Sequence, residues 1–176
     1  EEALAHEKYH GEKGEQRVSY SFDINPYPFQ QAILDKLEAE RQIWGNTRNL
    51  VVAATGTGKT VISAFDYRNF VNNHPGKTNR LLFVAHREEI LQQSIECFRG
   101  VLRNYNFGDL LVGKNTPSQL NYLFASIQTI NSKDLTAKFD EEYFDFIIVD
   151  EFHHAAAQSY RKLLEHFKPQ ILLGLT

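Results

Sequence analysis

The stretch Leu50-Val51-Val52-Ala53-Ala54-Thr55-Gly56-Thr57-Gly58-Lys59-Thr60 decides the fold, because an apolar run of strand length leads directly into a glycine-rich turn. The run 50–54 is continuous, which suits a strand buried on both faces. Gly56 and Gly58 allow a tight turn whose backbone N–H groups point inward and form a cradle for an anion. Apolar side chains then recur at helical spacing over residues 59–72. The sequence therefore predicts a strand, an anion-binding turn and a helix, in that order.

This order is typical of a loop that holds the phosphates of a nucleotide at a helix N-terminus, where free N–H groups favour negative charge. We expect Lys59 to reach the β- and γ-phosphates and the Thr60 hydroxyl to ligate Mg²⁺. The remaining cofactor-binding residues would be Thr55, Gly56, Thr57 and Gly58. The general consensus has glycine where this chain has Ala53. The alternative is an ordinary glycine-rich turn between a strand and a helix.

A second apolar run, Phe146-Ile147-Ile148-Val149, ends at the carboxylate pair Asp150-Glu151. Ligands of open α/β sheets bind at the carboxyl ends of the strands. In a chain with a phosphate loop, we expect Asp150 to hold Mg²⁺ and Glu151 to polarise the attacking water. The two motifs together predict that the chain binds ATP and Mg²⁺ and is built to hydrolyse the nucleotide.

The segment Asp150-Glu151-Phe152-His153 is close to a DEAH-type box, and over about residues 22–176 the chain resembles the first RecA-like motor domain of a superfamily 2 helicase. Its nearest resemblance is to the group that contains type III restriction motor subunits and related bacterial helicase-like proteins. Further segments resemble motifs of this family in the correct order: Pro28-Phe29-Gln30, Val84-Ala85-His86-Arg87-Glu88, Ala125-Ser126-Ile127-Gln128-Thr129 and Leu173-Gly174-Leu175-Thr176.

The resemblance implies roles for several residues. Gln30 would read the adenine edge, with Tyr27 or Phe22 stacking on the ring, and His153 would link the ATP site to the segment that ends at Thr176. Phosphates of a nucleic-acid strand would contact His86, Arg87, Ser126, Gln128 and Thr129. The alternative for Gln30 is an exposed residue at a helix N-terminus, like its neighbour Gln31. The alternative for the other five is surface capping after a strand.

Two histidine patterns suggest a metal site. His153 and His154 are adjacent, and chain neighbours are not expected to face one site as residues four apart on a helix do. The segment His6-Glu7-Lys8-Tyr9-His10 matches a zinc-protease pattern, but it lies in a charged stretch and glycine follows at once. We interpret both patterns as unrelated to metal binding.

Composition fits one globular domain without a membrane span. The chain has 176 residues, of which 42% are hydrophobic, and a net charge of −3. Its single cysteine, Cys97, fits a reducing compartment, and we expect the cytoplasm. Residues 1–21 are polar and without a clear period, so we expect an extension or linker before a domain spanning 22–176. The absence of methionine leads us to expect that both ends are cuts in a longer protein.

Strand and helix patterns alternate along the chain, which predicts an α/β fold of the RecA-like P-loop type, with a mostly parallel sheet and helices on both faces. Strands are expected at 50–54, 80–85, 110–112, 123–127, 146–149 and 171–175, and helices at 29–42, 59–72, 90–102 and 160–167.

The sequence thus predicts the motor domain of an ATP-dependent DNA or RNA helicase or translocase, with DNA the expected partner. The resemblance implies a second RecA-like domain in the full-length chain, which would supply arginines that stabilise the transition state. Two alternatives stay open: a motor subunit of a restriction system, and a nucleotide-gated interaction module without helicase activity.

Overall fold

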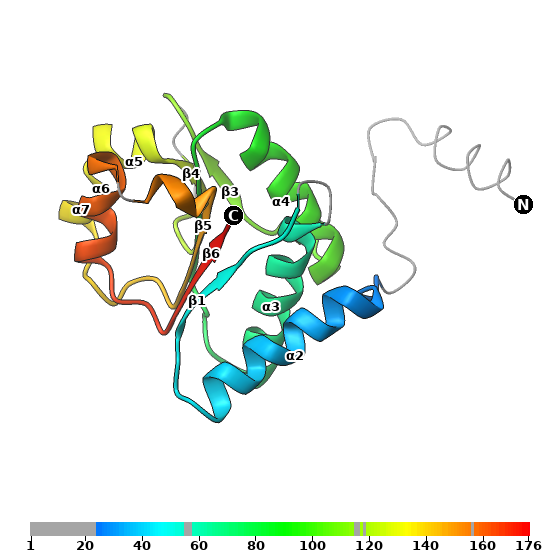
Figure 1. Ribbon diagram of the computed structural model, residues 1–176. Coiled ribbons are helices and arrows are strands. Elements are labelled where there is room, and N and C mark those ends of the chain that lie inside the picture. Colours follow the sequence, from blue (N-terminus) through cyan, green and yellow to red (C-terminus); the bar gives the residue numbers. More distant parts are fainter. Residues whose placement is uncertain (1–23, 55–57, 115–116, 118, 156) are drawn as a thin grey trace, which may run out of the picture.

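The computed structural model describes residues 24–54, 58–114, 117, 119–155 and 157–176. These residues form a six-stranded sheet with the strand order β1-β6-β5-β2-β4-β3 (Figure 1). All neighbouring strands pair in parallel, which confirms the predicted α/β fold. The strands are β1 (Arg48–Val51), β2 (Leu81–Ala85), β3 (Asp109–Leu111), β4 (Tyr122–Ser126), β5 (Phe146–Asp150) and β6 (Ile171–Leu175).

Helices cover both faces of the sheet, as predicted (Figure 1). One face carries α2 (Pro28–Gln42), α3 (Lys59–Asn73) and α4 (Glu88–Leu102), and the other carries α5 (Ile127–Ser132), α6 (Leu135–Lys138) and α7 (Gln158–His166). The sequence patterns do not predict α5 and α6, because six and four residues are too few for an amphipathic pattern to repeat. Among the described residues no helix is both long and apolar enough to cross a membrane.

The central strands supply both hydrophobic cores. Alternate residues of β2 point to opposite faces, so Leu81 and Phe83 enter the core under α3 and α4 while Leu82 and Val84 enter the core under α5 to α7. Such two-sided burial explains why the apolar runs of β2 and β5 are continuous. Cys97 packs against the first core, and burial raises the pKa of its thiol to about 11, as befits a structural thiol.

The prediction that strand 50–54 is buried on both faces is wrong. β1 is an edge strand that begins at Arg48, and Leu50 is 51% exposed and Val52 73% exposed. An apolar run of this length marks a strand, but it does not report how many neighbours the strand has. Pairing with β6 nevertheless continues past the strand end, since Ala53 N–H donates to the Thr176 carbonyl (3.1 Å) and Thr176 N–H to the Val51 carbonyl (3.0 Å).

The strand register brings the functional segments to one edge of the sheet. Ala85 pairs with Ser126, Asp150 with Leu175, and Val51 also with Leu175. Because all the strands are parallel, the segments that follow β1, β2, β4 and β5 leave the sheet at the same carboxyl edge.

Candidate nucleotide site and its surroundings

The start of α3 has the geometry of an anion site. Gly58 caps the helix with φ 78°, a left-handed conformation that favours glycine, and its carbonyl accepts the Ile62 N–H at 2.9 Å. Lys59 and Thr60 are the first two helical residues and are half-buried. The free N–H groups of this first turn would face a phosphate. Thr55, Gly56 and Thr57 lie outside the described residues, as do residues 1–23 with their predicted linker, Phe22 and the zinc-like pattern.

Gln30 lies against this turn rather than in solvent. Its side chain is 4% exposed, and its Oε1 accepts the Tyr27 N–H at 2.9 Å at the start of α2. A Cβ added to Gly58 would come within 2.7 Å of Gln30 Nε2. Gln31 is exposed and bonds to Asp35 at 2.8 Å instead. The alternative of an exposed helix residue is therefore wrong for Gln30, and its contact with adenine stays a prediction.

Asp150 is the last residue of β5, and its carboxylate is buried at the sheet edge. Burial raises its pKa, and the charge of Glu151 adds to the rise. The Glu151 N–H, which donates to Asp150 Oδ1 at 2.9 Å, and the charges of Lys59 and Arg87 act in the opposite direction. The charge of Lys59 thus acts on Asp150, which indicates that the start of α3 and the end of β5 lie near each other at this edge of the sheet.

The donors at this edge fit Mg²⁺. Asp150 offers a buried carboxylate and Thr60 a hydroxyl, the hard oxygen ligands that Mg²⁺ prefers. A divalent cation would also relieve the unfavourable proximity of two carboxylates, of which Asp150 is desolvated.

Glu151 has a left-handed backbone with φ 53°, which is strained for a residue other than glycine. This conformation turns the chain sharply after β5 and starts the 3₁₀ helix η1 (Phe152–His154). The Glu151 side chain is 30% exposed, and Arg87 Nη2 lies 3.9 Å from its Oε1. Arg87, predicted to contact nucleic acid, thus faces the catalytic candidate in this structure.

The acidic box also touches the end of β6. His153 Nδ1 lies within hydrogen-bonding distance of Thr176 Oγ1, at 3.1 Å. A Cβ added to Gly174 would come within 2.7 Å of the Phe152 ring, so glycine is needed for this close packing. Contact between the box and this segment is therefore present, and the coupling role of His153 stays a prediction.

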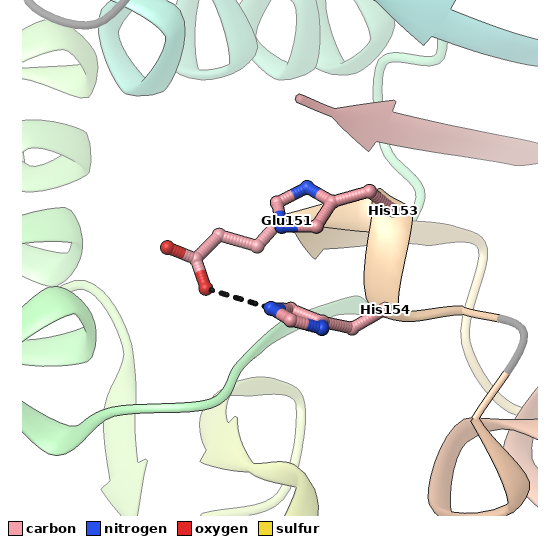
Figure 2. A group of neighbouring side chains, drawn as sticks. All are labelled: Glu151, His153 and His154. Atoms are coloured by element: carbon pink, nitrogen blue, oxygen red, sulfur yellow. Dashed lines mark ion pairs between the residues drawn. The ribbon is translucent and has the colours of Figure 1, made fainter.

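His154 joins His153 and Glu151 in one group (Figure 2). The two rings have their centroids 4.2 Å apart, and His154 Nε2 lies 3.7 Å from Glu151 Oε2. The sequence argument that neighbouring histidines do not face one site is therefore wrong. In a 3₁₀ turn residues three apart eclipse each other, which places His154 beside Glu151.

The predicted nucleic-acid contacts divide into two groups. His86 and Gln128 are exposed and adjacent, and Gln128 Nε2 donates to the His86 carbonyl at 3.2 Å. Ser126 and Thr129 are buried. Ser126 Oγ accepts the Thr129 N–H and donates to Thr129 Oγ1 at 2.7 Å, so the capping alternative describes both at the start of α5. Their contact with nucleic acid stays a prediction.

A family model described as "Type III restriction enzyme, res subunit" matches residues 23–176. The chain belongs to this family. The match confirms the prediction of a superfamily 2 motor domain near the type III restriction group, which the RecA-like architecture also supports.

The chain is also similar to two yeast proteins that bear helicase names. The chain is 33% identical over 151 residues to the "Putative ATP-dependent helicase IRC3" of Saccharomyces cerevisiae, covering 80% of this chain. It is 31% identical over 127 residues to the "Putative mitochondrial ATP-dependent helicase irc3" of Schizosaccharomyces pombe, covering 70% of this chain. These matches span 20% of the length of either relative.

The helicase domain of Hef from Pyrococcus furiosus has the same fold. It superimposes with a TM-score of 0.64 at 23% identity, over 86% of this chain and 32% of the Hef domain.

Proposed function

We propose that this chain is the ATP-binding motor domain of an ATP-dependent DNA or RNA helicase or translocase. The observation that carries the proposal is the convergence of Lys59, at the start of α3, and Asp150-Glu151, at the tip of β5, on one edge of the sheet. A restriction motor subunit would use the same chemistry, but the two relatives above 30% identity bear helicase names.

In this proposal the ATP phosphates lie at the N-terminus of α3. Lys59 neutralises the β- and γ-phosphates, Thr60 and Asp150 hold Mg²⁺, and Glu151 polarises the attacking water. Mg²⁺, when bound, supplies the positive charge that stabilises the phosphoryl group in the transition state. Gln30 orients the base, because its buried amide reaches the same turn from α2.

The proposed partners are a nucleic acid and a second RecA-like domain, and both would contact the carboxyl edge of the sheet. Nucleic acid, with DNA expected over RNA, would cross the exposed surface at His86, Arg87 and Gln128. A second RecA-like domain would supply arginines to the transition state, in keeping with relatives about five times longer than the matched region. The proposed compartment is the cytoplasm, although the fission-yeast relative bears a mitochondrial name.

Nucleic-acid-stimulated ATP hydrolysis by the full-length protein tests the function. We expect phosphate release to rise when single- or double-stranded DNA is added, and less with RNA of equal length. Hydrolysis that no nucleic acid accelerates would exclude the motor and favour the nucleotide-gated module.

Replacing Lys59 with alanine should weaken ATP binding by roughly a hundredfold, because charge-assisted hydrogen bonds to the phosphates are lost. Calorimetry with the magnesium nucleotide measures this change. Lys77→Ala is the matched control, since Lys77 is exposed in the loop after α3, outside the predicted site. Equal affinities of the wild type and Lys59→Ala would remove Lys59 from the site.

Replacing Gln30 with alanine should reduce the preference for ATP over GTP by up to about tenfold, the value of one or two hydrogen bonds to the base. Gln31→Ala is the matched control, because it removes an exposed glutamine at the next position and should leave the preference for ATP unchanged. Competition binding with ATP and GTP measures the preference of the wild type and of both variants. An unchanged preference in Gln30→Ala would reduce this residue to a structural role at the start of α2.

A further inference from the structure

Glu151, His153 and His154 each offer one donor atom, and these atoms all lie within 4.8 Å of one another (Figure 2). We propose that this cluster is a second metal site, selective for a transition-metal ion such as Zn²⁺, and that its occupation inhibits ATP hydrolysis. The inhibition rests on the function proposed above, whereas the binding of the ion does not.

The donor chemistry separates this site from the Mg²⁺ site. Two imidazole nitrogens and one carboxylate oxygen form a set that suits Zn²⁺ and related ions, whereas Mg²⁺ prefers oxygen ligands throughout. Three protein ligands leave a fourth tetrahedral position for water. Asp150 and Thr60 offer only oxygen, so the two ions would be distinguished by ligand type although Glu151 and Asp150 are adjacent in the chain.

The local backbone brings the donors near the required geometry. Glu151 Oε2 and His154 Nε2 are 3.7 Å apart. Tetrahedral ligands at Zn²⁺ distances of about 2.0–2.1 Å are separated by about 3.4 Å. The left-handed conformation of Glu151 and the 3₁₀ turn hold these two side chains together. Small rotations of exposed side chains would close the remaining gaps, since His153 and His154 both lie at the surface.

His153 has a feature typical of metal-ligating histidines. Such residues usually bond through their second ring nitrogen to a neighbouring polar group, which fixes the orientation of the ring. Nδ1 of His153 contacts Thr176 Oγ1 at 3.1 Å, which leaves Nε2 to face the ion. An ion at this cluster would therefore act on the contact between the acidic box and the end of β6.

The consequence for activity follows from Glu151. A carboxylate that ligates Zn²⁺ no longer polarises water, whereas Gly58 and Lys59 at the start of α3 are not ligands of the cluster. Zinc should therefore inhibit hydrolysis and leave nucleotide binding in place. Arg87, with Nη2 3.9 Å from Glu151 Oε1, competes with the ion for this carboxylate.

Binding is tested without nucleotide by titrating the 176-residue chain with Zn²⁺ in a calorimeter and with Co²⁺ in a spectrophotometer. We expect one ion per chain and the visible bands of tetrahedral Co²⁺. His154→Ala should weaken binding by about tenfold or more, and Arg87→Ala should tighten it. His166→Ala is the matched control, because His166 lies on α7, outside the cluster, where its ring bonds to the Phe139 carbonyl. Absence of binding, or equal loss in both histidine variants, would overturn the site.

Inhibition is tested on the full-length protein, with free Zn²⁺ fixed by a metal buffer so that ATP does not deplete it. His154→Ala should continue to hydrolyse ATP at a zinc concentration that stops the wild type. If zinc binds through His154 without slowing the wild type, the inhibitory role is wrong and the proposed function stands. If the protein hydrolyses no ATP even without zinc, both the proposed function and the proposed inhibition are wrong. The calorimetric titration still shows whether the cluster binds Zn²⁺.

Discussion

Replacing Glu151 with glutamine should lower ATP hydrolysis by the full-length protein by about a thousandfold, within the range that a positioned general base contributes. The amide keeps the shape of the side chain but loses the charge that polarises water. Affinity for ATP should change little, because the proposed phosphate contacts lie at the start of α3, with Lys59 and the backbone, and not at Glu151. Steady-state phosphate release and nucleotide calorimetry on the same two proteins measure both quantities.

Asp150→Asn tests the second carboxylate of the proposed site. The change removes the proposed anionic ligand of Mg²⁺, so both the magnesium dependence of ATP affinity and the rate of hydrolysis should fall. The 176-residue chain alone should hydrolyse ATP slowly, since the proposed arginines of a second domain would supply about a thousandfold or more. Undiminished turnover in the Glu151→Gln protein would remove the role given to Glu151, and rapid turnover by the chain alone would exclude the two-domain mechanism.

The parts of the fold that the sequence predicted are those that a local pattern encodes. Apolar runs located β2, β5 and β6, because a strand buried on both faces needs apolar side chains at successive positions. The position of Asp150 at a strand tip followed from the run before it. The same pattern failed for β1, since the number of neighbours of a strand depends on the order of strands in the sheet and not on its own residues.

The site details that the sequence did not predict depend on single backbone conformations and on contacts between distant segments. His154 lies beside Glu151 because Glu151 has a left-handed backbone and a 3₁₀ turn follows it. No sequence pattern predicts that a glutamate will adopt the left-handed conformation or that a 3₁₀ turn will follow. The burial of Ser126 and Thr129 depends on the short helix α5 and on Gly113, whose N–H donates to Thr129 Oγ1 at 3.0 Å. A motif could name these residues, but it could not say which of them face solvent.

A buried ion pair between α2 and α3 is a further feature without a local pattern. Arg41 Nη1 and Nη2 donate to Asp66 Oδ1 and Oδ2 at 2.5 and 2.7 Å, and Arg41 Nε donates to Asn49 Oδ1 at 2.9 Å. The side chains are 13% and 4% exposed. Burial raises the pKa of Asp66 above its ordinary value, although Arg41 acts in the opposite direction. The pair joins the carboxyl-terminal end of α2 to the middle of α3, so it stabilises the packing of the two helices whose first turns carry Gln30 and Lys59.

Replacing Arg41 with alanine should lower the free energy of unfolding by about 3–5 kcal/mol at neutral pH, because it leaves the Asp66 carboxylate buried without a partner. Folding already raises the pKa of Asp66, and loss of Arg41 raises it further. A group with a raised folded pKa favours folding when protonated, so this penalty grows as the pH rises through the folded pKa and shrinks as the pH falls. Urea unfolding of the wild type and the variant at neutral and mildly acidic pH measures both effects.

The double variant Arg41→Ala/Asp66→Asn is the matched control for the charge. An amide needs no counter-ion and does not titrate, so the double variant should recover part of the lost stability, and residue 66 should no longer contribute to the pH dependence of its free energy of unfolding. The two expectations separate an unpaired buried charge from a simple loss of packing between α2 and α3. A single variant whose deficit is the same at both pH values, or a double variant no more stable than the single, would show that the Asp66 charge does not set the cost.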